Sequence, residues 1–390
     1  MAPNGVDAST PWARPFPDGF LEPLAGELGL LTGIGTGLTI PNPDFEIPYT
    51  DQWSAGFDVQ LPYKVGLDIA YVGNQVSKLG VSRGINDIPK SENDKAIPSL
   101  GGNTGYLNQT FVNPFAGLVP GQGLNAATAS RGQLVRPYPQ FGGITMNRLN
   151  LGSSYYNALE AAATRRYSNG VMVAANYTWM KLEDALNFFT NYDTRPYRDI
   201  QGDQRRHRLT ITTLVDLPFG PGKFIGRNAT GVLAAIIGGW QFNTIGEFQS
   251  GRPLGLNGNA VQLDSSVALS GDEQSFSRWF DNSSSALNNP RPDGSYAWTL
   301  LGPNDYRVVK QRFHDVNEPT APQWSFSMFK NTPIGNGMVL QLRVETFNVF
   351  NTRIYGGPNT DPNSANFGIV DTASQVNFPR QTQIGVRVTF

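Results

Sequence analysis

The feature that most constrains this chain is a period of two in its apolar residues, repeated along most of its length. In residues 52–61, apolar side chains such as Trp53, Phe57 and Val59 alternate with polar or small ones. The alternation returns at 64–71, 171–179, 208–217, 240–249, 323–328, 339–345 and 381–390. Successive side chains of a β-strand point to opposite faces, so the pattern predicts half-buried strands. With residues 154–167, about nine strands of about ten residues each result.

The apolar stripe also changes character along a strand. In residues 171–179 the aliphatic Val171, Val173 and Ala175 give way to Tyr177 and Trp179. A lipid-facing stripe changes in this way where it leaves hydrocarbon and enters the interfacial aromatic girdle. Since no run of 18 or more apolar residues occurs, membrane-spanning helices are excluded. The sequence therefore predicts an all-β, antiparallel transmembrane β-barrel segment.

The connections between the expected strands alternate between short and long. Short turns rich in Pro, Asn and Gly occupy 61–64, 168–170 and 332–337, and a longer link from 218 contains a possible short helix in 231–239. Long connections fill 75–140, 181–205, 252–321 and 351–380. Outer-membrane barrels have this asymmetry of periplasmic turns and extracellular loops. A soluble β-sandwich or propeller is the alternative, although it has little need of several loops longer than about 20 residues.

Charged residues fall on the strand faces opposite the apolar stripes. By strand parity we expect five of them to face a water-filled lumen: Arg208, Glu247, Arg343, Glu345 and Arg387. A wide wet interior accommodates such charges without an apolar core.

Composition and motifs exclude several function classes. The net charge of −1 gives no basic excess for binding nucleic acid. The absence of cysteine excludes disulfides and thiolate metal sites. The two histidines, His207 and His314, belong to no catalytic motif, and His207 is expected on the lipid side near the loop end of its strand. We therefore expect no catalytic residue, metal site or cofactor, although the oxygen-rich stretch 361–371 leaves loop-bound calcium open.

Several strings, taken together and in order, resemble an Oar-like TonB-dependent outer-membrane receptor. They are "YPQFGG", "SSYYNALEAAATRRYSNGVMVAANYTWMKLEDAL", "GDQRRHRLTITTLVDLPFG", "GGWQFNTIGEFQSGRPL", "LRVETFNVFN" and the terminal aromatic. The resemblance implies a barrel of 22 strands behind an N-terminal plug that TonB pulls. On this reading residues 1–51 are an extracellular loop region and 52–390 the C-terminal part of the barrel. The first residues do not form a signal peptide, which suggests a fragment of a longer protein.

The resemblance also implies a function and partners. It implies uptake of a large, unknown solute across the cell outer membrane, driven through TonB by way of a plug absent from this chain, with the five lumen residues contacting plug or solute. The final strand, with Ile384, Val386, Val388 and Phe390 on one face, resembles the signal read by the barrel assembly machinery. An outer-membrane adhesin or structural barrel with ligand-binding loops is the alternative. Outer-membrane lipid is a partner in both cases.

Overall fold

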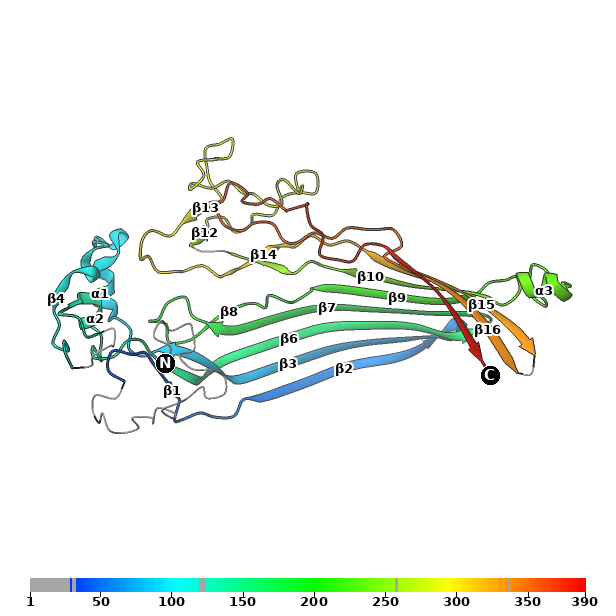
Figure 1. Ribbon diagram of the computed structural model, residues 1–390, viewed down its shortest axis with the longest axis horizontal. Helices are drawn as coiled ribbons and strands as arrows, with labels where there is room; N and C mark the ends of the chain where they lie inside the picture. Colours follow the sequence, from blue (N-terminus) through cyan, green and yellow to red (C-terminus); the bar gives the residue numbers. More distant parts are fainter. Residues whose placement is uncertain (1–28, 30–32, 119–123, 257–258, 336) are drawn as a thin grey trace, which may run out of the picture. The chain divides into compact units, whose positions relative to one another are not determined.

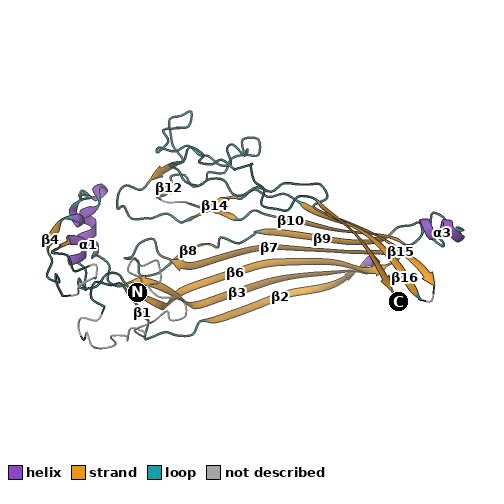
Figure 2. Cartoon of the chain, in the orientation of Figure 1, coloured by secondary structure: helices purple, strands orange, loops and turns teal. Residues whose placement is uncertain are grey.

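Long antiparallel strands make up most of the chain, as Figures 1 and 2 show. The computed structural model describes residue 29 and residues 33–390, except 119–123, 257–258 and 336. Two compact units are present. Unit 1 contains 1–40, 84–96 and 103–145, and unit 2 contains 41–83, 97–102 and 146–390. Each unit is described by itself.

One large sheet dominates unit 2, and among the described residues nine of its strands lie in series. Their order is β17-β16-β15-β10-β9-β7-β6-β3-β2, with β1 and β8 paired to β6 and β7 outside this path. The strands are β1 (Leu38–Pro41), β2 (Tyr49–Leu61), β3 (Val65–Gly84), β6 (Ile144–Ser168), β7 (Val171–Asn187), β8 (Tyr197–Ile200), β9 (His207–Asp216), β10 (Trp240–Gln249), β15 (Gln323–Gly335), β16 (Met338–Phe347) and β17 (Gln381–Thr389). The antiparallel sheet expected from the alternation is confirmed.

Several strands are much longer than the ten residues expected. β6 has 25 residues and begins at Ile144, well before the expected strand 154–167, and β3 has 20 residues and continues into the expected connection 75–140. The reason is that backbone pairing continues after the apolar stripe ends. In residues 146–154 the apolar Met146, Leu149 and Leu151 do not keep one parity, so the period of two disappears from the sequence although the strand continues.

The cross-strand register confirms the parity assignments. Residues directly opposite each other in an antiparallel pair lie on the same face. Phe57 faces Ile69, and Leu342 faces Val386. The same holds from β7 to β10, because Ala175 of β7 faces Ile211 of β9 and Ile211 also faces Gly246 of β10. The expected apolar sets thus merge into one continuous apolar face.

Two tryptophans on the apolar face each lie across a glycine of the neighbouring strand. Trp53 faces Gly73, and Trp324 faces Gly246. A Cβ atom added to Gly73 would lie 2.1 Å from the Trp53 indole, and one added to Gly246 would lie 2.7 Å from the Trp324 ring. The glycines are needed because the indoles occupy the space that a side chain would take.

Short turns gather at one end of the sheet. The 3₁₀ helix η2 (Pro62–Lys64) joins β2 to β3, and Asn169 and Gly170, with φ of 53° and 79°, join β6 to β7. Positive φ at both central residues is the requirement of a type I′ hairpin turn. The β9–β10 link carries α3 (Gly231–Ile237), which confirms the expected helix. This end lies on the right in Figure 1.

Unit 1 contains small elements around one buried amide. These are α1 (Lys90–Asn93), η3 (Asp94–Ala96), η5 (Tyr106–Asn108), β4 (Thr110–Val112), β5 (Thr128–Ser130) and α2 (Arg131–Leu134). The fully buried Asn86 donates to the carbonyl oxygens of Tyr138 (2.9 Å) and Gly142 (2.8 Å) and accepts from the Tyr138 backbone N–H (2.8 Å). Buried polar groups are stable only when bonded in this way.

In unit 2, the connections after β10 and β16 form an apolar core of their own. Four short strands support it: β11 (Pro253–Gly255) pairs with β14 (Arg312–Asn317), and β12 (Ala260–Gln262) pairs with β13 (Trp298–Leu300). The 3₁₀ helix η4 (Pro98–Leu100) completes the unit. The buried members of this loop core are Leu254, Ala260, Val267, Phe280, Ala297, Trp298, Phe313, Val316 and Phe367.

Candidate solute-facing surface

The five charged residues expected to face a lumen all lie on one face of the sheet, opposite the apolar face. The register links them: Glu247 faces Gln323 in β15, whose Ser327 faces Glu345. In β17, Arg387 faces Gln341, two residues from Arg343. This surface, which carries Arg208, Glu247, Arg343, Glu345 and Arg387, is called the polar face below.

The structure brings four of these five residues together as two pairs, and Arg387 belongs to neither pair. Arg208 Nη2 lies 2.9 Å from Glu247 Oε1, and Arg343 Nη2 lies 3.8 Å from Glu345 Oε1. The Arg343 guanidinium also lies 4.7 Å from the ring centre of Phe329, and Gln383 donates to Glu345 at 2.8 Å. The charges therefore neutralise one another locally, and the exposed side of each pair remains free to meet a polar partner.

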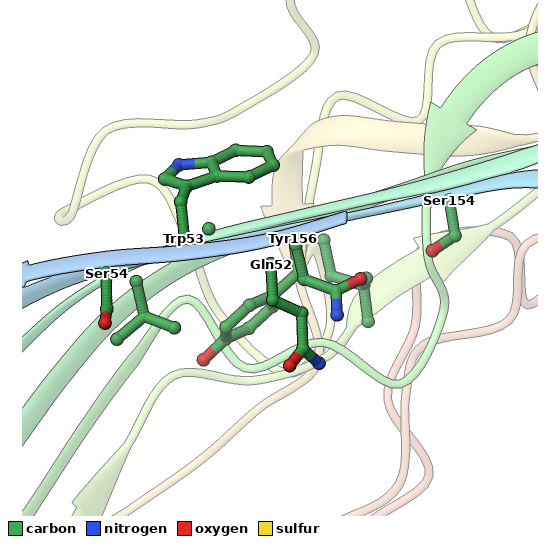
Figure 3. Close-up of a pocket in the computed structure, with 9 residues that line it drawn as sticks. Gln52, Trp53, Ser54, Ser154 and Tyr156 are labelled. Carbon is green, nitrogen blue, oxygen red and sulfur yellow. The ribbon is translucent and has the colours of Figure 1, made fainter. Parts of the chain in front are cut away.

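The polar face also contains a neutral hollow of about 520 Å³ near the β2 edge. Figure 3 shows Gln52 and Ser54 on the opposite side of β2 from Trp53, with Tyr156 and Ser154 beside them. Asn74 and Leu182 contribute to the same lining. The lining combines these polar groups with the apolar Val72 and Leu182 and contains no charged side chain.

The carboxylate of Asp281 forms hydrogen bonds that stabilise the loop core. Asp281 accepts from Arg291 Nε at 2.6 Å and from the Ser283 backbone N–H at 3.1 Å. Its backbone carbonyl accepts from the indole N–H of Trp298 at 2.6 Å. Burial alone would raise the pKa of Asp281, but the hydrogen bonds from Ser283 and Arg291 outweigh it and hold the pKa below its usual value.

A second, charged hollow of about 360 Å³ opens among the long loops. Arg252 forms a bidentate pair with Glu318, with N···O distances of 2.8 and 3.1 Å, and lies 3.6 Å from Asp203. The Arg312 guanidinium lies against Gly202, where a Cβ atom would come within 2.6 Å of it. The two guanidinium groups of this site are thus balanced by the carboxylates of Asp203 and Glu318 in the same lining.

Each histidine has a polar side-chain partner. The His207 ring lies 2.8 Å from the Tyr177 hydroxyl, and its residue faces Trp179 in the register, so it lies on the apolar face as expected. His314 Nε2 lies 3.3 Å from Asp199 Oδ1. Among the described residues, no serine or threonine hydroxyl bonds to either ring and no group of three or more His, Cys, Asp or Glu residues could hold a metal. In the same part of the chain, no helix has the length and apolar character to cross a membrane.

The final strand, β17, forms one margin of the sheet and pairs only with β16 along this path. The side chains expected to form an assembly signal are largely open: Ile384 is 78% exposed, Val386 67% and Phe390 96%. Val388 faces Leu340 of β16. At the other margin, β2 has β3 as its neighbour and is exposed along its length.

A sheet with one apolar and one charged face is typical of outer-membrane β-barrel proteins, and this chain belongs to that class. The chain is a member of the outer membrane beta barrel domain family, whose profile matches residues 2–383. The protein is therefore placed in the cell outer membrane. No curated protein sequence matches it.

Solved structures give fold-level likeness at low identity. The outer membrane transporter YddB from Escherichia coli is 9% identical with a TM-score of 0.40, and the match covers 91% of this chain and 34% of that one. FpvA of P. aeruginosa, in a complex with a pyoverdine and iron, is 12% identical with a TM-score of 0.35, covering 88% and 27%. The chain thus spans about a third or less of the length of these two proteins.

Sequence reasoning missed the loop core completely. Residues 252–321 and 351–380 were expected only to be long connections, yet Phe280, Trp298, Phe313 and Phe367 from them lie in mutual ring contact, with centroids 5.1–5.8 Å apart. The available signal was composition, since connections without a core rarely need several large aromatic residues. The aromatic residues of these two segments follow no regular period in the sequence.

Proposed function

We propose that the chain is the C-terminal barrel part of an Oar-like, TonB-dependent outer-membrane transporter. The observation that carries the proposal is the register, which assembles one apolar and one charged face across the series of strands. A sheet with these faces suits lipid on one side and a water-filled passage on the other. Membership of an outer-membrane barrel family supports a location in the outer membrane.

The two margins of the sheet suggest how it is completed. A strand in lipid must have all its backbone groups bonded, so β2 and β17 both require neighbours. Further strands of a barrel of up to 22 strands would supply them. The exposed residues Ile384, Val386, Val388 and Phe390 would first be read by the barrel assembly machinery.

In this role the polar face acts by binding and guiding, not by catalysis. Arg208, Glu247, Arg343, Glu345 and Arg387 would line the solute path or contact a plug domain, and the energy would come through TonB acting on that plug. Paired charges suit binding and guiding of a solute. Without a solute the two charges of each pair neutralise one another, and the exposed side of the pair can exchange water for a polar group of the solute.

The test uses the absence of cysteine in the chain. Single cysteines are introduced at neighbouring positions of opposite parity, Ile211→Cys with Thr212→Cys and Leu342→Cys with Gln341→Cys, in the full-length protein in liposomes. A bimane probe at 211 and 342 should be quenched by brominated lipid. The cysteines at 212 and 341 should instead react with a charged, water-soluble maleimide. Equal behaviour of both members of each pair would contradict the assignment of the faces.

A second experiment tests the dependence on TonB. The reading frame upstream should encode a plug, and the full-length protein should bind the purified C-terminal domain of TonB until its TonB-contact segment is deleted. A membrane-embedded barrel that never binds TonB would favour the adhesin alternative. Failure of this experiment and failure of the cysteine experiment are therefore distinguishable.

A further inference from the structure

On the apolar side of the sheet, a cluster of cations follows directly after the aromatic girdle. Along β7 the side chains of this face run from Val173 through Tyr177 and Trp179 to Lys181 and Glu183. The order is aliphatic, then aromatic, then charged. In a membrane protein it corresponds to hydrocarbon, interface and headgroups.

Three cations and one carboxylate make up this cluster. Glu183, nearly buried, lies 3.0 Å from Lys181 Nζ and 2.6 Å from Arg198 Nη2. The Arg198 guanidinium stacks on the Tyr155 ring with its carbon 4.0 Å from the ring centre. Arg195 joins Arg198 in lining an adjacent hollow of about 440 Å³. The cluster therefore keeps an excess of positive charge after Glu183 is paired.

Lys181 and Arg198 keep N–H donors that are not used in their pairs with Glu183. The Lys181 side chain is 54% exposed and that of Arg198 is 47% exposed. Because Glu183 and Tyr155 fix the Arg198 guanidinium, little conformational entropy is lost when it binds a further acceptor. The hollow is also lined by Ser153, whose hydroxyl adds a donor beside the arginines.

We propose that Lys181, Arg195 and Arg198 form a binding site for the phosphate group of a membrane lipid in the leaflet at the long-loop end of the barrel. Charge complementarity and position both favour a lipid. The cations lie on the face that carries the aliphatic stripe, one step beyond the aromatic girdle, where headgroup phosphates of surrounding lipid lie. Guanidinium groups bind phosphate through paired, charge-assisted hydrogen bonds. The site rests on the apolar face meeting lipid but is independent of TonB and of any solute.

The test measures lipid binding to the full-length protein in maltoside detergent by native mass spectrometry. The probe is bis-phosphorylated lipid A, with phosphatidylethanolamine as the zwitterionic comparison. The double variant Lys181→Gln/Arg195→Gln leaves the Arg198–Glu183 and Arg198–Tyr155 contacts in place. It should bind lipid A about 30-fold more weakly, because each cation near a membrane surface contributes roughly a fivefold factor.

The matched control is Lys223→Gln, an exposed lysine at the short-turn end that lies 3.8 Å from Asp216. It should bind lipid A as the wild type does. Heat-modifiable migration verifies that each variant is folded, and Arg198→Lys, which keeps the charge but loses the planar stack, should bind with intermediate affinity. Equal affinity in all these proteins would overturn the proposal. Displacement of lipid A by millimolar inorganic phosphate would also overturn it, since the site would then be one for free anions.

Discussion

Removal of the Trp298 side chain gives the sharpest test of whether the long loops form a cooperative core. Trp298 is fully buried, and its ring centre lies 5.2 Å from that of Phe313 and 5.5 Å from that of Phe367. A buried tryptophan removes roughly 150–250 Å² from water. At about 25 cal/mol per Å² this amounts to about 4–6 kcal/mol. Measured Trp→Ala changes in cores of about 3–5 kcal/mol agree.

Trp298→Phe serves as the graded companion. It keeps an aromatic ring in the core but removes the indole N–H that donates to the Asp281 carbonyl at 2.6 Å. Leaving that buried acceptor unsatisfied costs about 1–3 kcal/mol. The alanine variant should therefore be the more damaging of the two, and the phenylalanine variant should fall between it and the wild type.

The assay is hydrogen exchange followed by mass spectrometry of peptides from 253–320 and, separately, from β9 and β10. In Trp298→Ala, exchange in 253–320 should accelerate about 100- to 4,000-fold, since the loss of opening free energy is about 3–5 kcal/mol and about 1.4 kcal/mol is a factor of ten. Exchange in β9 and β10 should stay unchanged. Unaltered exchange in 253–320 would refute the cooperative loop core. Equal acceleration in the strands would show that core and sheet open together.

Three further predictions concern charge and assembly. In a double-mutant cycle of Arg208→Gln and Glu247→Gln, the coupling in unfolding free energy should be at most about 1 kcal/mol because the Arg208 side chain is 60% exposed and that of Glu247 is 35% exposed; a larger value from urea unfolding would mean that the pair is shielded. The pKa of Asp281 is depressed in the folded state, so its stabilisation of the loop core is complete above about pH 4 and is lost as the pH falls further. Protease cleavage of 253–320 should then increase on acidification in the wild type, and Asp281→Asn should make it less dependent on pH. Deletion of Phe390 should lower the heat-modifiable fraction in outer membranes several-fold if this residue belongs to an assembly signal, whereas an unchanged fraction would remove it from that role.

The sequence by itself determined the sheet and its two faces. Alternation is a local property: residues such as Val173 and Ile211 share a face because every strand places every second side chain on the same side. The tryptophans and charged residues could therefore be assigned to faces without knowledge of strand order, and the register agrees with those assignments. Strand lengths were underestimated, because β3 and β6 continue where the apolar residues no longer alternate regularly.

Only the tertiary structure decided how charged and aromatic side chains meet across long sequence separations. The pairing of Arg208 with Glu247 depends on the register between β9 and β10. Phe280, Trp298 and Phe367 come together from segments that carry no regular period. A local pattern records which face a residue occupies, but packing in irregular loops depends on chain paths that no short window of sequence contains.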